Sequence, residues 1–179
     1  MPQSEPITAL TDYAAAIASV VFAGAMYRRI GPGNRVSAWL WCAAFLAAAA
    51  AATAGGIFHG FTTSLQPAAL AMWWNVAMFL IGGTTAFVVA AIHGADVRRE
   101  DGTVGWLVAS IGVTLAGLAV QQGDFPRGVA FNHNDVYHVI QIAALYLLFR
   151  CARTTRDREA LAIIGTSIVP ASGKSTDPE

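Results

Sequence analysis

Residues 68–92 read AALAMWWNVAMFLIGGTTAFVVAAI, a run of 25 residues without one Asp, Glu, Lys or Arg. A helix needs about 20 mainly apolar residues to cross the roughly 30 Å of hydrocarbon in a bilayer, so this run is long enough to span a membrane. Four more mainly apolar stretches flank it, at residues 10–27, 36–61, 104–120 and 136–151. The sequence therefore predicts an all-α fold, a polytopic membrane bundle of five transmembrane helices over residues 1–151.

Composition supports a membrane protein. Of the 179 residues, 55% are hydrophobic and 12% are charged, whereas about a quarter of the residues in a soluble domain are charged. The ten-residue alternation of a lipid-facing β-barrel is absent from the sequence. Formal net charge is zero, so the charge balance gives no reason to expect nucleic acid as a partner. The expected partner is the lipid bilayer.

The basic residues predict the orientation of the bundle. Ten of the eleven fall in the segments after spans one, three and five, and only Arg127 falls on the other side. Loops rich in Lys and Arg stay in the cytoplasm, so we expect the amino terminus outside and the carboxyl terminus inside. Residues 152–179 are then a cytoplasmic and largely disordered tail. Glycines in the spans, among them Gly55, Gly82 and Gly117, are expected to allow close helix packing.

Polar side chains gather at one depth of this predicted topology. Ionisable and amide groups are costly inside a membrane, and they usually face the bundle interior, pair with one another or bind a ligand. All five spans supply such groups in their outer halves, which predicts a polar pocket that faces the exterior. Its expected members are Asp12, His59, Asn75, Gln121, Gln122, His133, Asn134, Asp135, His138 and Gln141.

The segment FNHNDVYH, residues 131–138, leads directly into the last apolar span. Asp135 and His138 are three residues apart and share one helix face. A second interpretation is equally open, because Asn132 or Asn134 would cap a helix well and Asp135 would favour the helix dipole. On that interpretation the segment only begins a helix.

The histidines suggest a metal. Three imidazoles, or two with a carboxylate, form a catalytic zinc site when a fourth position stays open. We expect His59, His133 and His138 as ligands, with Asp12 or Asp135 to orient a ligand or act as general base. Haem held by two of these histidines is an alternative. A structural polar layer without a ligand is another.

Three stretches carry a family resemblance: AGGIFHGF at residues 54–61, VQQ at 120–122 and the run from 131 to 150. They resemble an uncharacterised family of bacterial inner-membrane proteins. More distantly, a histidine that ends span two and the histidines of the last span resemble the alkaline ceramidase and CREST superfamily of membrane metal hydrolases. That resemblance implies zinc-dependent hydrolysis of an amide or ester in a lipid-like substrate. The chain differs from the superfamily pattern at Gly55, which takes the place of a serine, and at Asn134, which takes the place of a histidine.

Overall fold

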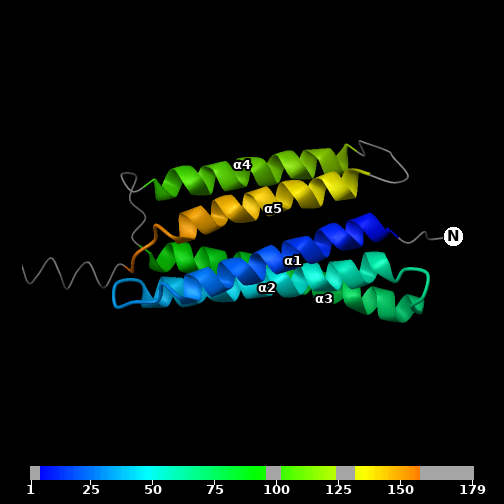
Figure 1. Cartoon of the computed structure of the whole chain (residues 1–179), viewed down its shortest axis with the longest axis horizontal. Coiled ribbons are helices and arrows are strands. Elements are labelled where there is room, and N and C mark those ends of the chain that lie inside the picture. The colour runs from blue at the N-terminus through cyan, green and yellow to red at the C-terminus, as the bar shows by residue number, and fades with distance from the viewer. Residues whose placement is uncertain (1–4, 96–101, 124–131, 158–179) are drawn as a thin grey trace, which may run out of the picture.

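The structure is a computed structural model that describes residues 5–95, 102–123 and 132–157 (Figure 1). Within these ranges the chain is helical, as predicted, and all five helices are long and apolar enough to cross a membrane. These lengths and compositions are those of a multi-pass membrane protein. The helices are α1 Pro6–Tyr27, α2 Arg35–Gly60, α3 Pro67–Gly94, α4 Thr103–Gln122 and α5 His133–Ala152.

Helix ends lie within a few residues of the predicted spans, and the differences have local causes. Helix α1 begins at Pro6 rather than at residue 10, because proline is favoured in the first helical turn, where its missing N–H costs nothing. Helix α5 begins at His133 rather than at residue 136, because Asn132 caps it. The predicted tail at residues 152–179 lies outside the described residues beyond Asp157.

The helices form two groups. Helix α2 packs against both α1 and α3, while α4 and α5 form an antiparallel pair that meets the rest mainly through α5 against α1 (Figure 1). One end of the bundle holds the start of α1, the end of α2 and the start of α5. The other end holds the α1–α2 connection and the end of α5. The α1–α5 contact therefore joins the two groups along their length.

Glycines mediate part of this packing. A Cβ atom on Gly56 would lie 2.7 Å from the Tyr13 ring, too close for the present packing, and one on Gly117 would lie 3.0 Å from the Ile140 side chain, which would have to move by a few tenths of an ångström. Both glycines thus allow a close helix contact. The packing interpretation is confirmed at these two sites. At Gly82 a Cβ would have no neighbour within 4 Å among the described residues, which therefore give this glycine no role in packing.

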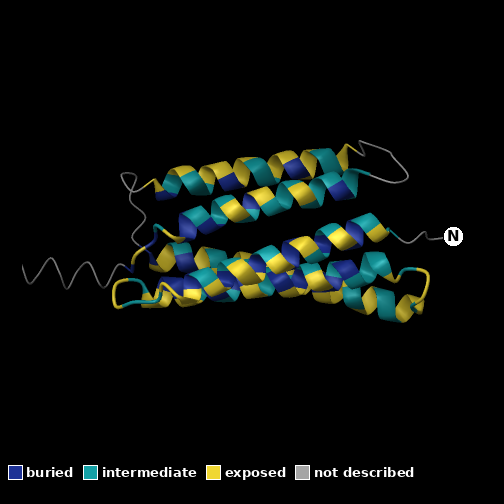
Figure 2. Ribbon diagram, viewed as in Figure 1, coloured by how far each residue is buried: buried dark blue, intermediate teal, exposed yellow. Residues whose placement is uncertain are grey.

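Exposed residues lie along all five helices (Figure 2), and many of them are large and apolar. Helices α3 and α4 are the most exposed, and residues such as Phe79, Val89 and Val108 project from them without cover in the described part of the chain. Exposed apolar surface of this extent suits a helix that faces lipid. The main buried core lies near the opposite end from the start of α1, where Trp41, Phe45 and Phe149 pack together.

Candidate metal site

Helix α1 brings a polar stripe to the end of the bundle where the chain begins. Glu5, Thr8 and Asp12 are spaced at i, i+3 and i+7, so they lie on one side of the helix start. Thr8 and Asp12 are 1% and 3% exposed. The backbone N–H of Glu5 donates to the carbonyl oxygen of His59 over 3.1 Å, which ties the start of α1 to the end of α2.

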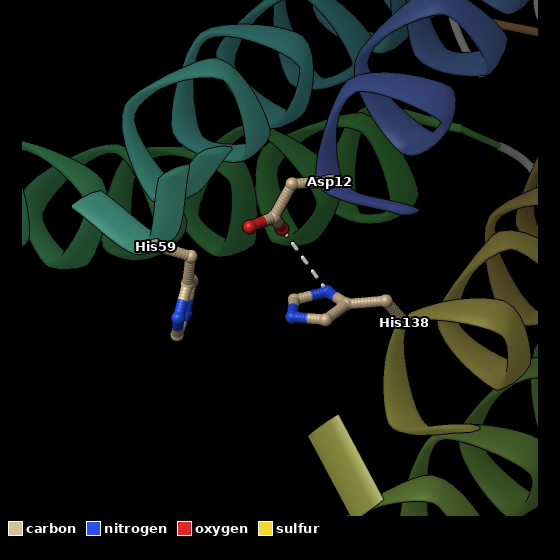
Figure 3. A group of neighbouring side chains, drawn as sticks. All are labelled: Asp12, His59 and His138. Atoms are coloured by element: carbon tan, nitrogen blue, oxygen red, sulfur yellow. Dashed lines mark ion pairs between the residues drawn. The ribbon is translucent and has the colours of Figure 1, made fainter. Parts of the chain in front are cut away.

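Three of the predicted site residues converge from three helices. Figure 3 shows Asp12 of α1, His59 of α2 and His138 of α5 pointing toward a common space. Each offers one ligand atom, and the three atoms lie within 4.8 Å of one another. The imidazole centroids of His59 and His138 are 6.2 Å apart, and the rings are nearly perpendicular. Because the three residues are more than 40 positions apart in the sequence, only the tertiary fold brings these groups together.

Each of the two histidines is paired with a carboxylate. His138 Nδ1 lies 3.1 Å from Asp12 Oδ1, and His59 Nδ1 lies 3.2 Å from Glu5 Oε2. A neutral His59 that donates to Glu5 from Nδ1 keeps its lone pair on Nε2, where it can bind a metal. A carboxylate behind a histidine ligand, as Glu5 is behind His59, is the usual arrangement in protein metal sites. Asp12 lies at Nδ1 of His138, so a metal shared by these two residues would bind His138 through Nδ1.

The second oxygen of Asp12 also fits a metal ligand. Asp12 Oδ2 is buried and has no hydrogen-bond partner among the described residues. A buried carboxylate oxygen without a hydrogen bond destabilises the folded protein, and a bound cation would offset that loss of free energy. Donor atoms around a tetrahedral zinc lie about 3.4 Å apart, so the three groups need to close by roughly 1 Å around an ion. Two histidines and one carboxylate are a known ligand set for catalytic zinc.

Asp135 lies in the first turn of α5 and is not part of the three-residue group. Its Oδ2 accepts from the backbone N–H of Asn132 over 2.7 Å, and the Asn132 side chain accepts in return from the backbone of residues 134 and 135. This is a capping box, so the interpretation of the segment as a helix start with Asn132 as the cap is confirmed. Asp135 Oδ1 accepts from the Thr8 hydroxyl over 2.7 Å. Both oxygens of Asp135 are thus held by protein groups.

The remaining predicted residues lie around this group or away from it. His133 is the first residue of α5 and is not part of the three-residue group. Asn75 is exposed on α3, and Gln122 is exposed at the end of α4. Gln121 and Gln141 are half-buried. Of the ten residues predicted for the polar layer, Asp12, His59 and His138 are therefore the three that the structure brings within metal-binding distance in the described part of the chain.

Sequence reasoning missed two contributors, Glu5 and Thr8. Glu5 binds His59 and also accepts from the Asn134 side-chain amide over 3.3 Å, while Thr8 binds Asp135. The signal was their helical spacing with Asp12, which predicts one shared face. Glu5 was overlooked because it precedes the first apolar span.

Five apolar helices and a partly buried cluster of two histidines and a carboxylate define a multi-pass membrane protein with a candidate metal site. Residues 7–99 and 86–157 match a family of unknown function, DUF6962, and the chain belongs to that family. The matched ranges together include nearly all of the five helices. No curated protein matches the chain, and no solved structure does.

Proposed function

We propose that this protein binds zinc through Asp12, His59 and His138 and hydrolyses an amide or ester bond in a lipid-like substrate. The observation that supports it best is the convergence of these three side chains from α1, α2 and α5. Asp12 takes the ligand place that the sequence suggested for His133. A bound zinc would supply a Lewis acid and would lower the pKa of water toward neutrality.

The chain's own residues would prepare the site in two ways. Glu5 would hold His59 through Nδ1, so that this ring keeps its Nε2 for the metal, while Asp12 and His138 Nδ1, which lie 3.1 Å apart, would share the metal between them. The Thr8 hydroxyl would fix the start of α5 through Asp135. Haem is less well supported, because haem iron takes two axial protein ligands and the buried carboxylate would have no place between them.

The proposal includes the membrane and the side that the site faces. We propose a bacterial inner membrane, with the amino terminus and the metal site on the exterior side and the carboxyl terminus in the cytoplasm. The support is the distribution of basic residues, of which Arg28, Arg29, Arg35, Arg150 and Arg153 all belong to the end opposite the site. A lipid-like substrate could then enter from the outer leaflet between the helices.

Metal analysis tests this proposal. Full-length protein, purified in an uncharged detergent, loaded with zinc and passed through gel filtration, is expected to keep about one equivalent. His138→Ala should keep less than about a tenth of an equivalent. His93→Ala is the matched control, because His93 is exposed at the far end of α3, and it should retain the metal.

Activity and spectra separate the alternatives. With zinc bound, a panel of fluorogenic fatty-acyl amides and esters should be cleaved, and chelator should abolish the cleavage. Metal binding without cleavage would refute the hydrolase but keep the zinc site. A Soret band in the purified protein would favour haem. Wild-type protein without metal or haem would leave the three side chains as a packing cluster, which is the non-enzymatic alternative.

A further inference from the structure

A second polar feature lies at the opposite end of the bundle from the metal site. It is an open pocket of about 550 Å³ between the α1–α2 connection and the segment that follows α5. Arg29 lines it from the first segment, and Arg153 and Arg156 line it from the second. All three arginines are exposed, so their guanidinium groups are accessible to a ligand.

Hydrogen bonds fix the two walls of this pocket to each other. The Asp157 carboxylate accepts from the backbone N–H groups of Val36 and Ser37 over 2.8 and 2.9 Å. The Asp157 backbone N–H donates to Gly33 over 2.9 Å. The indole N–H of Trp41 donates to the Thr155 hydroxyl over 3.1 Å. The pocket is therefore held in shape by segments more than 100 residues apart in sequence.

The positive charge of the pocket has little compensation in the described part of the chain. Four acidic residues are described, and three of them, Glu5, Asp12 and Asp135, are at the metal site. The fourth, Asp157, is engaged with the first amides of α2. No ion pair joins the three pocket arginines to a carboxylate within the described ranges. Such a pocket suits an anion that brings its own negative charge.

We propose that this pocket binds a phosphate group, carried by an acidic lipid headgroup or free in solution. Guanidinium groups bind phosphate oxygens through paired, charge-assisted hydrogen bonds. Basic pockets between transmembrane helices bind acidic headgroups in the same way. The pocket lies where a bilayer surface would meet the end of α5, so a headgroup could reach it from the membrane and a free phosphate from the solvent.

A matched pair of lipids tests the site. Dioctanoyl phosphatidic acid and dioctanoylglycerol differ by the phosphate alone, and their affinities for the full-length protein in uncharged detergent can be measured by calorimetry. The wild-type protein should bind the phosphatidic acid at least about tenfold more tightly. Inorganic phosphate is then added as a competitor. If it leaves lipid binding unchanged, the ligand is the headgroup, and if it displaces the lipid, the site accepts free phosphate.

Two double variants locate the binding. Arg153→Gln with Arg156→Gln should weaken phosphatidic acid binding by at least about tenfold. Arg28→Gln with Arg35→Gln removes two charges from the same end of the bundle without touching the pocket lining, and it should weaken binding less than about threefold. Both must remain monodisperse with the wild-type melting temperature. Equal weakening in the two variants, or equal affinity for the two lipids, would overturn the proposal.

Discussion

The contact between Gly55 and Asp12 allows a sharp test of the metal site. A Cβ atom on Gly55 would lie 3.1 Å from Asp12 Oδ2 and 3.3 Å from Oδ1, closer than carbon and oxygen normally approach. In Gly55→Ala the carboxylate must therefore move by a few tenths of an ångström. Because Asp12 lies 3.1 Å from His138 Nδ1, the movement displaces one proposed ligand and changes its distance from the second.

The size of the effect follows from how strictly metals constrain their ligands. Metal–ligand distances tolerate deviations of about 0.2 Å, which is less than the expected movement of the carboxylate. Loss of a group that only orients a ligand typically weakens metal binding by about 10- to 100-fold, and a small displacement of a ligand should act at the lower end of that range. We expect the Kd for zinc in Gly55→Ala to rise by about tenfold, or about 1.4 kcal/mol. The fold should survive, because the methyl group meets a side chain and not the backbone.

Competition against a chelating indicator gives the zinc Kd of each purified variant. Gly82→Ala is the matched control, since a Cβ there meets no atom of the described residues within 4 Å and the substitution should leave the Kd unchanged. Melting temperatures in detergent show that both variants remain folded. If Gly55→Ala binds zinc within about twofold of the wild type while folded, the carboxylate of Asp12 is not a ligand and the reasoning fails.

Two further predictions concern stability. Thr8→Val removes the buried hydroxyl that donates to Asp135, and it should lower the free energy of unfolding by about 1–3 kcal/mol, as measured by thermal or denaturant unfolding in detergent. Thr11→Val, whose hydroxyl bonds only within α1, should cost clearly less, and an equal cost would contradict the role of Thr8. For Asp157, partial burial opposes ionisation, but hydrogen bonds from Ser37 outweigh it and hold the pKa below its ordinary value of 3.8. Its contribution to stability is thus present above pH 3.8 and lost as the pH falls through the lower folded-state pKa. The melting temperature of the wild type should fall more steeply below pH 4 than that of Asp157→Asn, and parallel curves would refute the assignment.

The sequence predicted the helices because apolar runs set their length and the bilayer sets the length required. It also placed Asp12, His59 and His138 at one level along the helices, and the structure brings these three side chains together. The sequence could not predict which of the polar side chains point into the bundle, because the side of a helix that faces the interior depends on how the helices pack. Asn75 shares the predicted depth but lies on an exposed face.

His133 shows the same limit in another form. The sequence favoured it as a ligand because it is a histidine close to His138. The capping box sets α5 to begin at His133, so the two residues are five apart within one regular helix and point in different directions. Hydrogen bonds specific to the fold, such as the one between Thr8 and Asp135, have no sequence pattern of their own.

The candidate metal site lies on the contact that joins the two helix groups, and this position couples its geometry to their docking. His138 belongs to α5, whereas Asp12 and His59 belong to the group of α1, α2 and α3. A ligand that needs all three side chains binds only when α5 is docked on α1, so its binding energy adds to the stability of that docked state. The Thr8 bond at the start of α5 acts in the same direction without a ligand. The polar groups that would hold a metal therefore also determine how the α4–α5 pair meets the rest of the bundle.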